Sequence, residues 1–476
     1  MRFNRLLPLI VACALFIENM DSTVLSTSLP AIAADLATDP IALKLALTAY
    51  LLSLAVFIPV SGWVADRFGA RPTFMIAITV FLLGSIGCAA SGSLGTLVAA
   101  RFVQGMGGAM MVPVGRLVLL RVVPKSELVQ ALSWLTIPAL VGPVVGPPLG
   151  GFITTYWHWR WIFLINIPIG LLGIALAKRF IPDIRESPPP LDWLGFALTG
   201  GGLALAMFGF STLGRHLVPV EVAMVTLVLG AAALVGYAVH ARRTAHPLLD
   251  LELFKLATYR AGVGGGSLFR IGVGATPFLL PLMLQLGFGL SPVQSGMLTF
   301  VSAMGAMFMK TLAARILNRA GFRRVLVVNG IAASALIGAC GLFRPETAHV
   351  VIVATLLVSG FFRSLQFTSL NAISYADVDS NRMGQASSLA GMMQQLSLSL
   401  GVAIGGYLLQ IVGLASDRPA TDVHNFYLAF LGVGLISASC VFFMWRLPRN
   451  AGAEMSGRGR LGREVAEPKP AQLPAT

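Results

Sequence analysis

The chain has 476 residues, of which 56% are hydrophobic and only 11% are charged. Soluble domains carry roughly 25% charged residues, so this composition excludes a water-soluble globular protein. The formal net charge of +14 would fit a nucleic-acid partner if the basic residues shared one groove. They lie mostly in short segments between apolar runs, which argues against nucleic acid and is typical of membrane topology.

A helix that crosses a bilayer needs about 20 mostly apolar residues. The first apolar run has a basic start but no small-residue cleavage site, so we expect it to be retained as a membrane span. Proline and glycine interrupt many runs, which neighbouring helices make tolerable. In chain order, the runs predict fourteen spans, at residues 6–30, 42–63, 72–91, 94–120, 130–155, 161–180, 192–213, 219–240, 259–286, 292–314, 322–342, 349–373, 385–412 and 424–445.

The distribution of Lys and Arg predicts the orientation of these spans. With the N-terminus in the cytoplasm, most of the 34 basic residues fall in cytoplasmic segments. The opposite side holds only Lys44, Arg160, Arg215, Arg344 and Arg418. The positive-inside rule therefore places both termini in the cytoplasm and requires an even number of spans. We expect a multi-pass protein of the cytoplasmic (inner) membrane.

An internal repeat is visible in two places. Residues 62–71 are echoed by residues 314–323, and residues 101–104 of the fourth span by residues 363–366 of the twelfth. Repeated halves around a central site are the usual plan of secondary transporters. We therefore predict an all-α membrane fold of two pseudo-symmetric six-helix bundles with an extra pair of spans between them. The predicted boundaries are 1–180 for the first bundle, 181–258 for the inserted pair and its linkers, 259–448 for the second bundle, and 449–476 for a disordered basic cytoplasmic tail.

Two carboxylates lie deep inside a span: Glu18 and Asp21, three residues apart on one face of the first helix. A charged acid buried in a membrane span costs free energy unless it is paired, protonated or in a water-filled cavity, so it is a functional candidate by default. At 1.5 Å per residue, Arg101 lies at a depth similar to Asp21. We expect Asp21, Glu18 and Arg101 to form the proton-coupling group. A static structural ion pair explains the same residues equally well.

Other polar residues within the spans are candidates for a substrate cavity: Gln104, Arg270, Arg363, Gln366, Asn371, Gln394 and Gln395. The deep arginines would make such a cavity cationic, opposed by only two acids. Hydrogen bonding between helices alone would also explain the amides.

Two glycine-containing motifs are candidates for gates. The first, at the cytoplasmic mouth, contains Gly62, Asp66, Arg67, Gly69 and Arg71, and its carboxylate can cap a helix and pair with Arg116. The second lies in the fifth span and contains Gly142, Pro143, Gly146, Gly150 and Gly151. Glycines allow close helix contact and prolines kink a helix, so a plain structural kink is the alternative. The cysteines are not spaced for a metal site.

These motifs together resemble the major facilitator superfamily, specifically its fourteen-span EmrB/QacA-type drug:proton antiporters. The resemblance covers essentially the whole chain in order. It rests on residues 19–30, 62–71, 101–107, 142–151 and 159–168. The resemblance implies that Asp21 is the proton-linked acid, Arg101 its coupling arginine and Asp66 the cytoplasmic gate. Exporters of lipophilic cations in this family often carry further deep acids. Here Glu18 is the only extra acid, so Arg270 and Arg363 favour anionic or zwitterionic substrates.

The expected function is therefore proton-coupled efflux of small amphipathic drugs or metabolites by alternating access, with no enzymatic activity. No phosphate-cradling GxxxxGK[ST] loop is present in the sequence, so we expect the proton gradient, without a cofactor, to supply the energy. An importer or uniporter of a small organic anion with the same fold is the main alternative, and a non-transporting membrane sensor or scaffold is another. The expected partners are a small-molecule substrate and the lipid bilayer. A periplasmic adaptor and an outer-membrane channel are further candidate partners, which the sequence does not decide.

Overall fold

The computed structural model describes residues 6–123, 128–212, 218–416 and 418–453. These residues form helices and connecting segments, without strands. Thirteen helices within them are long and apolar enough to cross a membrane. The predicted span at 130–155 coincides with a further helix, α6 (Leu128–Tyr156). For residues 128–140 of this helix the structure describes the backbone only. Most of the predicted tail, residues 454–476, also lies outside the described residues.

The first half of the chain follows the predicted spans closely. The first span continues beyond its main helix through a 3₁₀ turn to a short helix, because Pro30 removes a backbone donor. The elements are α1 (Leu6–Val24), η1 (Leu25–Thr27), α2 (Leu29–Asp35), η2 (Pro40–Leu43), α3 (Lys44–Phe68), α4 (Ala70–Ala89), α5 (Leu94–Val122), α6, α7 (Trp161–Leu164) and α8 (Asn166–Phe180).

The inserted pair and the second half contain several wider, π-helical turns, which are often found at functional sites. The inserted pair comprises α9 (Trp193–Phe196), η3 (Ala197–Gly201), α10 (Gly202–Thr212) and α11 (Val220–Ala241). The second half comprises η4 (Leu251–Lys255), α12 (Ala257–Tyr259), η5 (Arg260–Gly265), α13 (Gly266–Leu282), η6 (Met283–Gly287), α14 (Pro292–Ala320), α15 (Phe322–Ala339), η7 (Cys340–Leu342), α16 (His349–Ser374), η8 (Ser380–Arg382), α17 (Met383–Ser416), α18 (Val423–Ala438) and α19 (Cys440–Trp445).

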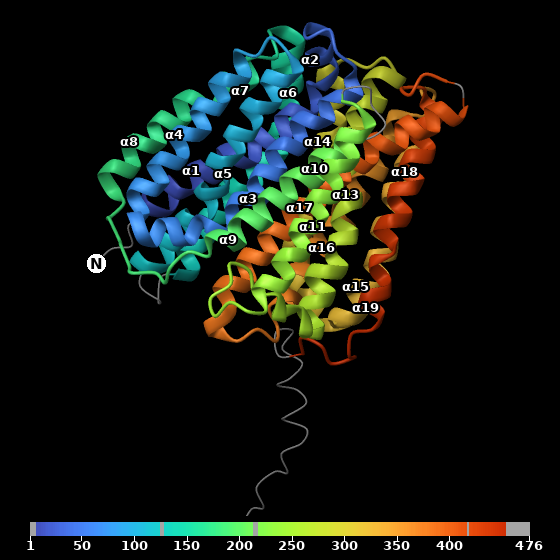
Figure 1. Ribbon diagram of the computed structural model, residues 1–476. Coiled ribbons are helices and arrows are strands. Elements are labelled where there is room, and N and C mark those ends of the chain that lie inside the picture. Colours follow the sequence, from blue (N-terminus) through green and yellow to red (C-terminus); the bar gives the residue numbers. More distant parts are fainter. Residues whose placement is uncertain (1–5, 124–127, 213–217, 417, 454–476) are drawn as a thin grey trace, which may run out of the picture.

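The two halves pack their helices in the same pattern. Helix α1 packs on α6 as α13 packs on α17, and α3 packs on α5 as α14 packs on α16. Helix α4 likewise packs on α8 as α15 packs on α18. Figure 1 shows the first half, in blue and cyan, beside the second, in yellow to red. The repeated pattern fits the sequence echoes, since α5 and α16 carry the matching Arg-x-x-Gln segments.

The described hydrogen bonds between the halves lie towards the end of the molecule that carries α2, the upper end in Figure 1, whereas apolar contacts between α3 and α17 continue further down. Gln285 Nε2 donates to the Thr27 carbonyl at 2.9 Å, and the Val293 N–H donates to Thr155 Oγ1 at 3.1 Å. Lys44, which was counted among the basic residues on the side opposite the cytoplasm, begins α3 and is buried, with Nζ 5.9 Å from the ring centroid of Tyr407. The larger hydrophobic core includes residues of both halves and, in the second half, continues to the lower end.

The inserted pair lies against both halves. Helix α10 contacts α3 of the first half and α17 of the second, and apolar side chains from all three share a hydrophobic core. Asp192 fixes the entry to α9 by accepting hydrogen bonds from the Gly195 N–H at 2.8 Å and the Leu248 N–H at 3.2 Å. Helix α11 is mostly exposed and apolar, with Val228 and Val235 at 60% and 66% accessibility. An exposed apolar face of this kind faces lipid in a membrane protein.

Candidate functional site

Asp21 is buried in the last turns of α1, only 2% exposed. Helix α1 ends at Val24, and α6 packs along α1. The carboxylate of Asp21 points into the first half, towards α5 and α8. A carboxylate in this setting needs a cation and hydrogen-bond donors around it. All of them come from the first half.

Arg101 supplies the cation. It lies in α5, fully buried, with Nη1 2.5 Å from Asp21 Oδ2. The predicted pair is therefore present in the structure. The guanidinium carbon lies 4.2 Å from the centroid of the Tyr50 ring of α3, so the arginine is held between the carboxylate and an aromatic face.

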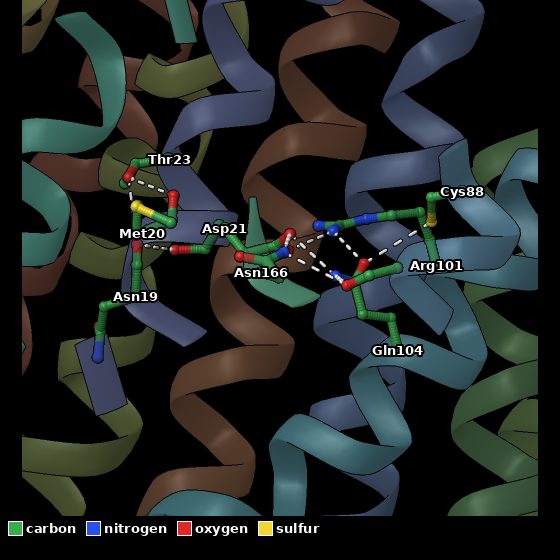
Figure 2. Close-up of polar contacts among 10 residues, drawn as sticks. Asn19, Met20, Asp21, Thr23, Cys88, Arg101, Gln104 and Asn166 are labelled. Atoms are coloured by element: carbon green, nitrogen blue, oxygen red, sulfur yellow. Dashed lines mark hydrogen bonds and ion pairs between the residues drawn. The ribbon is translucent and has the colours of Figure 1, made fainter. Parts of the chain in front are cut away.

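Two amides complete the cluster around Asp21 (Figure 2). Gln104 Nε2 donates to Asp21 Oδ1 at 2.9 Å, and Asn166 Nδ2 donates to the same oxygen at 3.0 Å. Both amides also donate to Ser85 Oγ, at 2.8 and 3.3 Å. Gln104 was predicted to line a substrate cavity, but in this structure it is fully buried inside the cluster.

The cluster has capacity for a second arrangement. Nε and Nη2 of Arg101 are buried and have no hydrogen-bond partner among the described residues. Protonation of Asp21 would remove the charge that holds the guanidinium, and the unused donors of Arg101 would then favour another acceptor. Such a paired and an unpaired state are what a proton-controlled switch requires.

Glu18 has a different environment from Asp21. It lies one turn earlier in α1 and keeps partial solvent exposure, although it points inward: a Cβ on Gly108 of α5 would lie 3.6 Å from Glu18 Cγ. The charged groups that act on it are Asp21 and Arg116. Its carboxylate makes no hydrogen bond within the described part of the chain. The structure therefore separates the two acids into one held by an ion pair and hydrogen bonds, Asp21, and one without a hydrogen bond, Glu18.

Two arginines inside the spans of the second half have no carboxylate partner among the described residues. Arg270 of α13 is 2% exposed and donates only to neutral oxygens, Asn371 Oδ1 at 2.9 Å and the Gly262 carbonyl at 3.3 Å. Its Nε has no partner among the described residues. Arg363 of α16 is partly exposed and makes no hydrogen bond or ion pair in the described part of the structure. Within the described ranges, no carboxylate is near enough to act on either guanidinium.

The amides of the second half divide into two groups. Gln366 is fully buried, accepts from Asn329 Nδ2 at 2.9 Å and donates to the Leu326 carbonyl at 3.1 Å, so it joins helices and does not line a path in this structure. Gln394 and Gln395 of α17 are partly exposed and make no hydrogen bond within the described residues. Those two remain available to a ligand.

Asp66 lies at the lower end of the molecule, where α3 gives way to α4. Its partner is not Arg116, as predicted, but Arg121: Nη1 of Arg121 lies 2.8 Å from Asp66 Oδ1, and Nη2 lies 3.1 Å from Glu186 Oε1. Residues after α8 fold back over this turn, with the Glu186 N–H donating to the Asp66 carbonyl at 3.0 Å. Gly69 has φ +100°, and a Cβ there would lie 2.3 Å from Asp183 Oδ1.

The charged and glycine neighbours of Asp66 are less constrained. Arg67 is exposed and Arg71 partly exposed, and neither side chain makes an ion pair in the described part of the chain. A Cβ on Gly62 would meet nothing within 4 Å. Of the two glycines of this motif, only Gly69 is required by close packing at the turn.

The glycines of α6 face two different neighbours. A Cβ on Gly142, Gly146 or Gly150 would lie 3.0, 2.0 or 2.4 Å from an atom of α1, respectively. Gly151 faces the other half, where a Cβ would lie 2.4 Å from the Pro292 carbonyl oxygen. The motif thus presses α6 against α1 and against α14, and Pro143 leaves the helix unbroken.

The chain matches the model of the Major Facilitator Superfamily over residues 11–236 and 262–471. The chain belongs to this superfamily. It is 37% identical over 448 residues to MdtD of Escherichia coli (strain K12) and of Shigella boydii serotype 4, proteins named for multidrug resistance, covering 93% of this chain and 94% of each relative.

Solved structures agree on the fold. A D-xylose-proton symporter superposes with a TM-score of 0.69 at 16% identity, covering 94% of this chain and 98% of its own. The human organic anion transporter MFSD10 (TETRAN) gives 0.60 at 14% identity, covering 93% and 100%. The major facilitator fold predicted from the sequence is confirmed, and the protein is a multi-pass membrane transporter.

The sequence prediction missed three residues of the Asp21 cluster. Asn166 was noted only as part of a matching segment, and Ser85 and Tyr50 were not considered. A lone Asn at the start of an apolar segment was the available signal, because a buried amide needs partners. For Ser85 and Tyr50 no such signal exists, since serine and tyrosine are common in spans.

Removing the guanidinium of Arg101 should destabilise the protein through the carboxylate left behind. Arg101→Ala buries an unpaired Asp21 charge, which typically costs about 3–5 kcal/mol. We expect a clear drop in melting temperature in detergent. The double variant Arg101→Ala/Asp21→Asn should recover more than half of that loss, because its amide needs no counter-charge. A double variant no more stable than the single one would show that the pair does not carry this energy.

Breaking the Asp66 contact should slow transport with little effect on folding. Asp66 and Arg121 are each about a fifth exposed, so Asp66→Asn should cost only about 1 kcal/mol. Because the contact joins α3 to α5, its loss should lower the rate of transport several-fold. Initial rates and melting temperatures measure the two effects, with Glu252→Gln as the control, since Glu252 pairs only with Lys255 on the exposed surface. Equal rates in the two variants would contradict this role.

Proposed function

We propose that the protein is a proton-coupled antiporter of the fourteen-span EmrB/QacA type, which exports small amphipathic drugs or metabolites from the cytoplasm. In this proposal it lies in the cytoplasmic membrane with both termini in the cytoplasm, as the positive-inside rule favours. The first and last described helices begin and end at the same, lower end of the molecule (Figure 1), which agrees with an even number of spans.

The Asp21 cluster carries the proposal. Asp21 is the deeply buried acid of the described spans, and its bond to Arg101 joins α1 to α5. A proton that neutralises Asp21 changes how these helices are held, which is how one site can make transport depend on protonation. Glu18, one turn away and without a hydrogen bond among the described residues, is close enough for its charge to act on Asp21 and is suited to pass protons to and from it.

Substrate preference follows from the charges of the second half. Among the described residues, Arg270 and Arg363 have no counter-acid, and the amides of Gln394 and Gln395 have no hydrogen-bond partner. A substrate with an anionic or zwitterionic group would supply the missing negative charge. Export is supported by the relatives named for multidrug resistance. An importer or uniporter of an organic anion is the rival function, because the same arginines would serve it.

The direction of flux separates the two functions. In inverted membrane vesicles with an acidic lumen, an antiporter should accumulate substrate, and dissipating the gradient should release it. We expect amphipathic anions and zwitterions to be preferred over lipophilic cations. Arg363→Gln should weaken this preference by about tenfold. Arg344→Gln should leave it unchanged, because Arg344 donates to the Gly341 and Phe343 carbonyls at the upper end and lies over the Tyr427 ring. Substrate uptake that stops at equal concentrations on both sides and does not respond to the pH gradient would favour the uniporter.

A further inference from the structure

A cavity of about 400 Å³ opens at the lower end of the second half, away from the Asp21 cluster. Its lining residues are Ala320, Gly321, Arg323, Arg324, Val327, Val328, Trp445 and Arg449. They come from the junction of α14 and α15 and from the end of α19, two elements that lie side by side in Figure 1. Three of the eight side chains are guanidinium groups, and none is an acid.

The cavity is the second-half counterpart of the Asp66 turn. Gly321, like Gly69, has a positive φ, +76°, and Arg323 occupies the position of Arg71 in the sequence echo. In the first half, Asp183 lies against the turn and Glu186 binds Arg121. In the second half the arginines keep their charges uncompensated: Arg323, Arg324 and Arg449 form no ion pair in the described part of the chain.

Each arginine is fixed near the cavity by a separate feature. Arg323 and Arg324 lie in the first turn of α15, where the positive end of the helix dipole adds to their charge. The Arg323 guanidinium carbon lies 5.6 Å from the centroid of the Trp445 ring. Arg449 is brought to the cavity by the chain after α19, which packs on α15: a Cβ on Gly452 would lie 2.7 Å from the Phe322 ring.

An exposed apolar surface leads from the arginines along the spans. Val328 and Ile331 of α15 are 59% and 53% exposed, and Phe442 and Trp445 of α19 are 56% and 64% exposed. Arg324, Val328 and Ile331 are spaced four and three residues apart, so they form one stripe on α15. A Trp beside arginines at the end of a span is typical of the headgroup level of a bilayer.

We propose that this cavity binds the headgroup of an anionic membrane phospholipid. The phosphate lies among Arg323, Arg324 and Arg449, and the acyl chains run along Val328, Ile331 and Phe442. Basic pockets between spans at the membrane surface suit such headgroups, and arginine forks match phosphate oxygens. The apolar stripe selects a lipid over a free phosphate, because a free anion would leave that stripe unused. This site is independent of the substrate and of proton coupling.

Lipid titration followed by native mass spectrometry tests the proposal. The probes are cardiolipin, phosphatidylglycerol, phosphatidylcholine and inorganic phosphate, added to the purified full-length protein. We expect the two anionic lipids to bind and the other two probes to bind at least tenfold more weakly. Arg323→Ala/Arg324→Ala should weaken cardiolipin binding by about 10- to 30-fold, since each arginine near an anionic surface contributes roughly a factor of five.

The matched control is Arg242→Ala/Arg243→Ala, which removes two adjacent exposed arginines at the end of α11. It should change cardiolipin binding less than twofold. Equal weakening in both double variants would overturn the proposal, because it would mean diffuse attraction to the basic surface. Equal binding of phosphatidylcholine would show that the arginines do not select, and tight binding of inorganic phosphate would assign the cavity to a soluble anion.

Fluorescence provides a second readout that does not depend on comparing affinities. Phosphatidylglycerol with brominated chains should quench Trp445 when it occupies the cavity. The quenching should fall in Trp445→Phe, and it should also fall in the Arg323→Ala/Arg324→Ala variant, which retains the tryptophan. Undiminished quenching in the arginine variant would contradict the proposed site.

Discussion

Replacing Asp21 with asparagine should abolish accumulation of substrate against its gradient while leaving exchange of substrate intact. The amide keeps the size of the carboxylate but cannot release a proton, so one transport cycle no longer moves a proton. A pH difference of 2 units is worth about 2.7 kcal/mol per proton, or about 100-fold in concentration. The parent should approach that accumulation in vesicles, and Asp21→Asn should show none.

Counterflow, in which labelled substrate exchanges with unlabelled substrate, should continue in Asp21→Asn within a few-fold of the parent rate. That result would separate lost coupling from lost folding. Glu18→Gln is the matched comparison on the same helix face. It should slow accumulation but not abolish it, because Glu18 lies outside the Arg101 cluster. Full accumulation by Asp21→Asn together with none by Glu18→Gln would transfer the coupling role to Glu18.

Adding one methyl group at Gly296 should prevent the two halves from closing at the upper end. Gly296 lies in α14 where it meets α6, and a Cβ there would lie 2.3 Å from the Pro147 carbonyl oxygen. Such an overlap typically costs about 1–3 kcal/mol, all of it in the state in which this end is closed. We expect Gly296→Ala to shift the protein towards the state with this end open and to lower transport about tenfold or more.

The control for Gly296→Ala is Gly95→Ala, in the first turn of α5, where a Cβ meets nothing within 4 Å. Closure can be measured with a short bifunctional thiol cross-linker between cysteines placed at Thr155 and Val293, which are hydrogen-bonded across the halves. The cross-link should form readily in the parent and in Gly95→Ala, and poorly in Gly296→Ala. An unchanged cross-link in Gly296→Ala would show that the helices separate elsewhere.

Helix geometry explains which part of the site could be predicted. Depth along a span follows from the rise per residue, so the sequence was enough to match Arg101 with Asp21. Gln104 lies three residues after Arg101, on the same helix face. This spacing indicates a place beside Asp21, whereas Gln104 was predicted to line the substrate cavity. Asn166 begins α8. The sequence did not show which face of α8 is turned towards Asp21, so this contact could not be predicted.

The Asp66 contact was predicted with the wrong arginine for a similar reason. Arg116 and Arg121 lie five residues apart on α5, so they point in different directions, and only packing decides which one reaches Asp66. Glu186 also contacts Asp66 and Arg121, because the segment after α8 folds back over the turn. The sequence of that segment shows no pattern that predicts this path. Gly296 was likewise missed, because a single glycine in an apolar helix does not reveal which helix it faces.

Proton movement during substrate transport tests the central claim most directly. Proteoliposomes are loaded with substrate and a trapped pH-sensitive dye, then diluted into substrate-free buffer without an imposed pH gradient. Antiport predicts that protons enter as substrate leaves, so the lumen becomes acidic, and that Asp21→Asn releases substrate without this acidification. Substrate release that makes the lumen alkaline, or that leaves its pH unchanged in the parent, would contradict proton-coupled antiport.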